Sequence, residues 1–269
     1  MFFFFDFRSA ITENFFFLSH RRSAITTFKV WWSNFRSAII TFMLHFFNNL
    51  LSLIVPDFCF YCNQPLKEGE RCLCENCKKK IPRTRSEKPD NEAEHRVFGK
   101  FRYEHGASFC YYRKEGDFAS LIIRAKYLDK PWINYDLATM FASELSPAGW
   151  PFDIDLIMPV PIHFLRRLRR GYNQSQPIAE ALSKAWKLPI DTKNLIKSRY
   201  TSSQVTNTGL QRLDAMEGTF SLRHPEKLAG RHVLLVDDVL TTGATLDACA
   251  QLLIQAGARV SFLTLGLSD

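Results

Sequence analysis

Apolar residues occur along this chain in two alternating patterns. An uninterrupted apolar run at 233–236 and the segment 155–161 have the length and composition of strands that are buried on both faces of a sheet. Apolar side chains three and four positions apart predict helices at 117–127, 134–145 and 179–186. Strands that alternate with helices predict an α/β fold built on a parallel sheet.

Two further segments complete the predicted sheet and its edge. The aromatic-rich residues 98–112 predict two strands joined near Gly106. Residues 195–204 begin as a strand and continue into a polar loop rich in hydrogen-bond donors, which is typical of an active-site lid. Ligands of parallel sheets bind at the carboxyl ends of the strands, so the Pro-Val-Pro turn at 159–161 and the loop after 236 are expected to reach one crevice.

The strand at 233–236 is followed by an acidic pair, a small hydroxyl-rich turn and the start of a helix. Free amides at a helix N-terminus, with threonine hydroxyls beside them, attract an anion, and a glycine lets the backbone approach it closely. The carboxylates Asp237 and Asp238 must instead face a donor, such as ribose hydroxyls, or a cation. The candidate anion-binding residues are Thr241, Thr242, Gly243, Ala244 and Thr245.

Two other interpretations of this segment compete with a phosphate–sugar site. The first is an ordinary strand–turn–helix with an acidic turn, which would have a structural role only. The second is a P-loop nucleotide site with one of the two aspartates holding the metal. The P-loop is set aside because the chain contains no Gly-x-x-x-x-Gly-Lys-Ser/Thr.

Two Cys-x-x-Cys pairs lie ahead of the predicted sheet. Four thiolates at this spacing can surround one zinc ion tetrahedrally, as in a zinc ribbon, and leave no open position for catalysis. A module this small cannot build its own core, so the metal would contribute folding energy. Cys72 is an alternative ligand to Cys74, whereas Cys110 and Cys249 are expected to be buried thiols without function. The predicted ligands are Cys59, Cys62, Cys74 and Cys77.

Positive charge is concentrated at residues 166–170, where four of five residues are arginine, followed by Gly-Tyr-Asn-Gln-Ser. Arginine forks match phosphate oxygens bidentately. The simpler interpretation is a solvated basic helix or turn, but the adjacent donors favour a binding site. The net charge of +8 suits an anionic partner, although solvated surface lysines are its default explanation.

Residues 1–42 differ from the rest of the chain. They hold 11 of the 24 phenylalanines and repeat Arg-Ser-Ala-Ile every 14 residues, a period shorter than those of known solenoids. We predict that they are translated repetitive DNA and that synthesis begins at Met43; the alternative is a hydrophobic membrane-surface or partner-binding extension. No uninterrupted apolar run of about 18 residues occurs, so a membrane span is not expected.

The order of these motifs resembles the ComF family of the type I phosphoribosyltransferase superfamily. That family includes proteins linked to DNA uptake in natural competence and gluconate-utilisation relatives. The resemblance covers residues 43–267, and one position departs from it, because Ala215 stands where members often have asparagine. Besides the four cysteines, the matching elements are Lys126-Tyr127, Pro159–Pro161, Arg170–Gln174, Arg199 with Gln204, and Asp237–Thr245.

The resemblance implies a type I phosphoribosyltransferase-like parallel sheet flanked by helices and preceded by a small zinc-ribbon module. It implies binding of phosphoribosyl pyrophosphate (PRPP), or a related phosphorylated sugar, with Mg²⁺. Asp237 and Asp238 would hold the ribose and its metal as the catalytic pair, and the threonine turn would cradle the 5′-phosphate. Lys126, Arg170 and Arg199 would be further phosphate ligands.

The implied reaction is displacement of pyrophosphate from C1 of PRPP, in a protein connected with DNA uptake. The alternative is a nucleic-acid-binding competence or gluconate-utilisation-type protein that retains a PRPP-like site without transferase activity. The implied partners are single-stranded DNA and the competence machinery. The expected metal besides Mg²⁺ is a structural Zn²⁺, and the expected location is the cytoplasm. The expected organisation is an extension at 1–42, a short helix and zinc ribbon at 43–82, a polar linker at 83–96, and a phosphoribosyltransferase-like domain at 97–269.

Overall fold

The computed structural model describes residues 57–112, 130–150, 152–197 and 219–268, except for the side chains of Arg166, Arg169 and Arg170. The chain divides into two units, Met1–Asp57 and Phe58–Asp269, and all described residues except Asp57 belong to the second. The repeat at 1–42, the helix expected after Met43 and the helix expected at 117–127 therefore lie outside the described residues.

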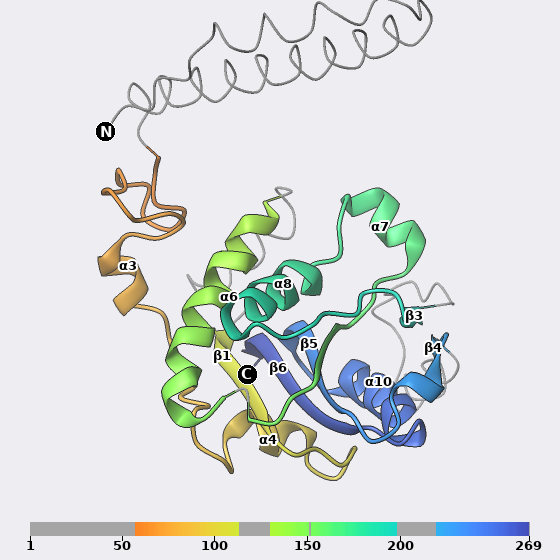
Figure 1. Cartoon of the computed structure of the whole chain (residues 1–269). Helices are drawn as coiled ribbons and strands as arrows, with labels where there is room; N and C mark the ends of the chain where they lie inside the picture. Colours follow the sequence, from red (N-terminus) through yellow and green to blue (C-terminus); the bar gives the residue numbers. More distant parts are fainter. Residues whose placement is uncertain (1–56, 113–129, 151, 198–218, 269) are drawn as a thin grey trace, which may run out of the picture. The chain divides into compact units, whose positions relative to one another are not determined.

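Four strands form a parallel sheet in the order β1-β6-β5-β2, and each neighbouring pair runs in the same direction (Figure 1). The parallel sheet predicted from the hydrophobic pattern is thus confirmed. The strands are β1 (Gly106–Tyr112), β2 (Leu156–Pro159), β5 (His232–Leu240) and β6 (Arg259–Ser268).

Helices cover both faces of the sheet. One face packs against α6 (Pro131–Leu145) and α8 (Ser175–Trp186), and the other against α4 (Glu92–Val97) and α10 (Ala244–Gln255) (Figure 1). The helices predicted at 134–145 and 179–186 are confirmed as parts of α6 and α8. Proline at the first position of α6 suits a helix start, because its fixed φ is helical and its missing N–H would have no partner there.

The packing of β5 explains the continuous apolar run at 233–236. Leu234 and Val236 belong to the hydrophobic cluster that includes α6 and α8, whereas Val233 and Leu235 belong to the cluster that includes α10. Successive side chains of a strand point to opposite faces, so a strand covered on both sides needs apolar residues at every position.

Shorter elements complete the described chain. The helix α7 leads from β2 to α8, and β3 and β4 form a separate antiparallel pair. None of the helices in the described segments is long and apolar enough to cross a membrane. The bounds are α3 (Glu75–Lys79), α7 (Phe164–Arg170), β3 (Leu195–Lys197), β4 (Phe220–Leu222), and the 3-10 turns Ser146–Ala148 and Pro225–Lys227.

The two strands expected at 98–112 are one strand, β1, which starts at Gly106. Before it, Phe101 and Tyr103 pack edge-on against Phe262, so their aromatic character serves a ring cluster instead of a second strand. Backbone bonding to the region of β6 begins only with the Glu104 N–H, which donates to the Val260 carbonyl at 2.8 Å. Glycine is required at 106, because a Cβ there would collide with the Phe262 ring.

The segment 83–96, expected to be a linker, is folded against β1. The Thr84 N–H donates to the Phe109 carbonyl, and α4 begins with a capping box formed by Asn91 and Glu94. The Glu94 carboxylate is buried and accepts a 2.9 Å bond from the Gly106 N–H. The segment is polar because its side chains satisfy backbone groups, and sequence composition alone does not distinguish this from a solvated linker.

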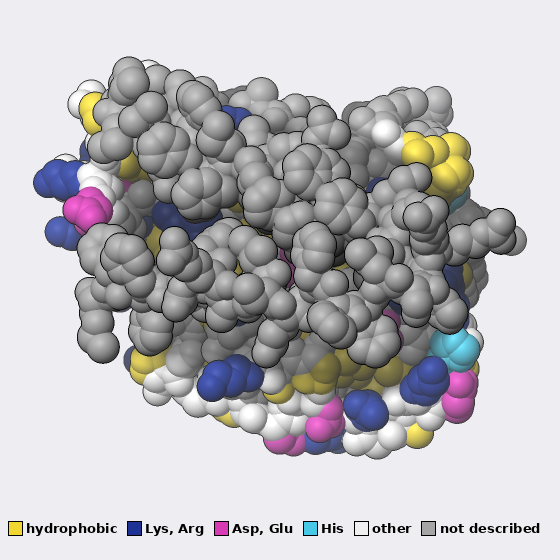
Figure 2. Space-filling model, turned by 45° about the horizontal axis from the view of Figure 1, so that its top comes forward, with side chains coloured by type: hydrophobic (Ala, Val, Ile, Leu, Met, Phe, Trp, Pro, Cys, Tyr) yellow, Lys and Arg dark blue, Asp and Glu magenta, His cyan; other side chains and the backbone are white. Residues whose placement is uncertain are grey.

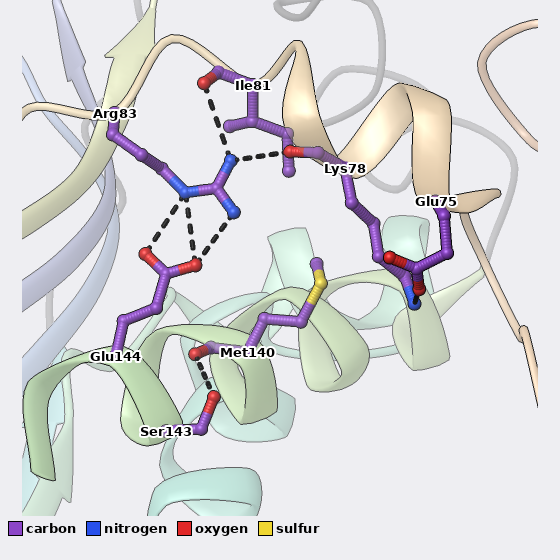
Figure 3. Close-up of polar contacts among 7 residues, drawn as sticks. All are labelled: Glu75, Lys78, Ile81, Arg83, Met140, Ser143 and Glu144. Carbon is purple, nitrogen blue, oxygen red and sulfur yellow. Dashed lines mark hydrogen bonds and ion pairs between the residues drawn. The ribbon is translucent and has the colours of Figure 1, made fainter.

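Arg83 fastens the end of the cysteine region to α6 (Figure 3). Its guanidinium donates to Glu144 Oε1 at 2.7 Å and to the Lys78 carbonyl at 2.9 Å. It also lies over the Phe109 ring, 4.6 Å from the ring centroid. The N–H groups and the planar face of one guanidinium thus join α3, α6 and a residue of β1.

Candidate functional site

The acidic pair lies inside β5 and not after its end. The predicted strand stops at Val236, but β5 continues to Leu240, and Asp237 and Leu240 pair with Thr264 and Leu267 of β6. The longer strand forms because β6 offers backbone partners along its whole length, and ladder bonding does not depend on side-chain polarity. The pair still lies in the carboxyl-terminal half of the strand, where α/β sheets bind ligands.

Both carboxylates are half-buried and each accepts local hydrogen bonds. Asp237 Oδ1 accepts from the Ser175 hydroxyl and from the Asp238 N–H, both at 2.9 Å. Asp238 Oδ1 accepts from the Val239 N–H at 2.9 Å. The bond from Ser175 is long-range in sequence, and no spacing rule would have found it.

The turn after β5 presents small polar groups at the start of α10. Thr241 and Thr242 are exposed, and Thr242 Oγ1 accepts from the Ala244 N–H at 3.4 Å. Gly243 caps the helix with φ of +79°, and a Cβ there would lie 3.1 Å from Val97 Cγ1. The left-handed backbone favours glycine at this position.

Arg96 of α4 contributes positive charge beside this turn. Its Nη1 donates to the Thr241 carbonyl at 3.0 Å. Sequence reasoning missed this residue, because it lies in the segment taken for a linker and 145 positions before its partner.

The Pro-Val-Pro turn ends the strand next to β5. β2 pairs with β5 through Pro159 and Val236, and the Val160 N–H donates to the Val236 carbonyl at 2.8 Å. Asn173 Nδ2 in turn donates to the Val160 carbonyl at 3.0 Å. The structure therefore brings together three regions that the sequence singled out separately, namely the turn at 159–161, the segment 171–175 and the acidic pair.

Several predicted phosphate ligands are not placed. Lys126 and Arg199 lie outside the described residues, and the side chain of Arg170 is not described. The arginine run itself forms α7, where Arg167, Phe164 and Leu168 are exposed. In Figure 2, basic side chains on the described part of the visible face lie apart from one another and beside acidic ones, so they do not form one continuous patch there.

The four predicted cysteine ligands form one cluster, in which all four sulfur atoms lie within 4.8 Å of one another. Burial raises the pKa of Cys59, but hydrogen bonds from backbone amides, including those of Cys62 and Cys74, outweigh it and lower the pKa to about 7. Burial raises the pKa of Cys72 to about 12, and this cysteine is not part of the cluster. Four thiols in this arrangement can hold a metal ion, and Cys74, not Cys72, is the fourth member.

A second polar network lies at the opposite end of β5. His232 Nδ1 bonds Asp153 Oδ1 and His232 Nε2 bonds Ser261 Oγ, both at 2.8 Å. Arg259 also pairs with Asp153, and together with His232 it lowers the pKa of Asp153 to about 2. The order Asp–His–Ser resembles a hydrolase triad, but His232 and Ser261 are both fully buried, so a substrate has no access to them.

Comparison with known proteins gives one family match and several similar relatives. The family model described as phosphoribosyl transferase domain matches residues 168–265. Competence protein F of Haemophilus influenzae is 33% identical over 144 residues, which cover 52% of this chain and 62% of that relative. DNA utilization protein YhgH of Escherichia coli is 28% identical over 221 residues, covering 77% of this chain and 94% of that relative. These matches support the ComF family of the phosphoribosyltransferase superfamily for this chain.

Other similarities of this chain are more distant. Competence protein ComFC of Streptococcus pneumoniae is 26% identical over 72% of this chain and 86% of its own length. The match to the structure of glutamine phosphoribosylpyrophosphate amidotransferase from B. subtilis covers 53% of this chain and 30% of that protein's chain, with 19% identity and a TM-score of 0.36. The match to adenine phosphoribosyltransferase from Leishmania tarentolae covers 54% of this chain and 75% of that protein's chain, with 15% identity and a TM-score of 0.34. At these scores the structural likeness adds nothing to the family assignment.

Proposed function

We propose that this ComF-family protein binds PRPP with Mg²⁺ at the carboxyl end of β5 and takes part in DNA uptake as a phosphoribosyltransferase. The observation that carries the proposal is the juxtaposition of two chemistries on one strand–turn–helix unit. Acceptor carboxylates at Asp237 and Asp238 are followed at once by a glycine-capped helix start with threonine hydroxyls. The DNA-uptake part rests on the names of the relatives, which are competence and DNA utilization proteins.

Each half of the unit suits one part of the ligand. The N-terminus of the 12-residue helix α10 and the hydroxyls of Thr241, Thr242 and Thr245 would bind the 5′-phosphate. Asp237 and Asp238 can only accept hydrogen bonds when ionised, so they would hold the ribose hydroxyls and the bound cation. Lys126, Arg170 and Arg199 would contact the pyrophosphate.

The proposed reaction displaces pyrophosphate from C1 of the sugar by an acceptor nucleophile. Positive charge develops on the ribose and negative charge on the leaving group. The acidic pair would stabilise the first, and the basic side chains the second, in a site that is organised before the reaction. Bound Mg²⁺ would supply further neutralisation of the pyrophosphate.

The decisive experiment is a calorimetric titration of the full chain with PRPP, with and without Mg²⁺. We expect binding that is tighter with Mg²⁺, because the cation reduces repulsion between the pyrophosphate and the acidic pair. Ribose 5-phosphate, which lacks the pyrophosphate, is the matched control ligand and should bind more weakly with little response to Mg²⁺. Absence of PRPP binding in the presence of Mg²⁺ would remove the proposal.

The net charge of +8 and the arginine-rich α7 favour a second candidate, a nucleic-acid-binding competence or gluconate-utilisation-type protein that retains the ligand site without transferase activity. Pyrophosphate release from PRPP across candidate acceptors distinguishes the two, since only the transferase releases it. Single-stranded DNA affinity that falls steeply with salt would support the second candidate, and no binding at low salt would count against it.

We also propose that the cysteine cluster holds a structural zinc ion, which implies a reducing, cytoplasmic location. Four thiolates complete a tetrahedral zinc shell. We expect one zinc per chain by elemental analysis and about none in Cys77→Ser, with Cys110→Ser as the matched control that keeps its zinc. A zinc-free chain with unchanged unfolding would show that the cluster has another role.

A further inference from the structure

Ser175 makes a buried link between helix α8 and the acidic pair. It is the first residue of α8, it is 2% exposed, and its hydroxyl donates to Asp237 Oδ1 at 2.9 Å. The direction of this bond is fixed by chemistry, because an ionised carboxylate only accepts. The same oxygen also accepts the Asp238 N–H at 2.9 Å.

The backbone around Ser175 is fastened on two sides. Asn173, itself buried, donates from Nδ2 to the Val160 carbonyl at the end of β2 and accepts from the Ser175 N–H at 3.4 Å. Asn134 of α6 donates to the Gln174 carbonyl at 3.4 Å. The hydroxyl is therefore held at a set place beside β5, and helix α8 packs along this strand (Figure 1).

The fixed Ser175 hydroxyl restricts the orientation of the Asp237 carboxylate. The terminal torsion of an aspartate is broad and costs little to rotate. Two donors that meet at one oxygen define the plane of the carboxylate and therefore the direction in which it meets a ligand. Preorganised groups of this kind lower the cost of binding, since less freedom is lost when the ligand arrives.

We propose that Ser175 is a positioning residue that sets the orientation of Asp237 toward the sugar ligand. This inference rests on the proposed function, because it assumes that Asp237 faces PRPP. Ser175 itself is not assigned any contact with the ligand.

The test compares three variants by PRPP titration with Mg²⁺ and by chemical unfolding. Ser175→Ala should raise the dissociation constant about tenfold with little change in unfolding, because alanine suits the first turn of a helix. Ser183→Ala is the matched control: it removes a hydroxyl from the same helix, where Ser183 donates to the Leu188 carbonyl, and should leave the dissociation constant unchanged. Ser175→Thr restores the hydroxyl and should recover most of the affinity.

A double-mutant cycle with Asp237→Asn separates positioning from a general packing effect. If Ser175 acts through Asp237, adding Ser175→Ala to Asp237→Asn should cost much less than tenfold. An undiminished cost in that background would overturn the inference, and so would normal affinity of Ser175→Ala or equal losses in the alanine and threonine variants. Failure of the unchanged chain to bind PRPP would instead overturn the proposed function, and this inference with it.

Discussion

The two ends of strand β5 carry polar groups with opposite characters. At the start, His232 is fully buried and bonded through both ring nitrogens, to Asp153 and to Ser261. Toward the end, Asp237 and Asp238 are half-buried and lie next to a turn whose threonines are exposed. The histidine and serine of the first network lie in the protein interior, whereas the acidic pair lies beside an exposed turn in the half of the strand where parallel sheets bind ligands.

This difference shows that residue types alone are a poor guide to function. The network at the start of β5 contains the three residue types of a hydrolytic triad, yet its histidine and serine have no access to solvent. The acidic pair contains two common residues of one type, yet their exposure and neighbours suit a sugar phosphate. Burial assigns a structural role to His232 and Ser261 at the start of the strand, and the exposure of the turn beside the acidic pair agrees with the binding role proposed for that end.

The largest expected effect is on stability at the buried end. His232→Ala removes a large buried side chain and leaves Ser261 and Asp153 without their shared partner, which should lower the free energy of unfolding by about 3 kcal/mol. Urea unfolding measures this, and PRPP affinity of the folded fraction should not change. His224→Ala, at an exposed site paired with Glu226, is the control and should cost less than about 0.5 kcal/mol. Loss of PRPP binding in a fully stable His232→Ala would reverse the assignment of roles.

The next largest expected effect is on PRPP binding at the carboxyl end of β5. Asp238→Asn should weaken PRPP binding about tenfold or more while the free energy of unfolding changes by less than about 1 kcal/mol, because it removes a charge that a ligand donor or cation would face. Calorimetry and urea unfolding of the same sample measure both. Asp90→Asn, which changes an exposed carboxylate, is the control and should bind normally. A normal dissociation constant for Asp238→Asn would mean that the acidic pair is only structural.

The smallest effect is a pH dependence at the buried end. Arg259 and then His232 lower the pKa of Asp153 to about 2, below the ordinary value of 3.8. A depressed pKa stabilises the fold above the unfolded value, and the contribution is lost as pH falls from about 4 toward 2. Because Asp153 is largely exposed, solvent screening limits the contribution to under about 1 kcal/mol.

Comparing urea unfolding of the unchanged chain and Asp153→Asn at several pH values between 5 and 2.5 measures this contribution. The difference between the two should be largest at pH 5 and should shrink as pH falls. A difference that stays constant across this range would show that the ion pair does not titrate with the fold.

The sequence was sufficient where a local pattern has a local cause. The apolar run at 233–236 predicted a buried strand, and the paired cysteine spacing predicted a four-thiol cluster. The sequence-based predictions were wrong where the same composition suits two different structures. The polar segment 83–96 was expected to be a linker but packs on β1, and the aromatic residues before Gly106 form a ring cluster instead of a strand.

By itself, then, the sequence determined the alternation of strands and helices, the order of motifs and the residues of the acidic pair and its turn. These depend on hydrophobic periodicity and on backbone geometry within a few residues. Only the tertiary structure decided that Ser175 bonds Asp237, that Arg96 reaches Thr241 and that His232 is sealed between Asp153 and Ser261. Those contacts join residues at least 29 positions apart, and they form only when the sheet register and the helix packing bring their backbones together.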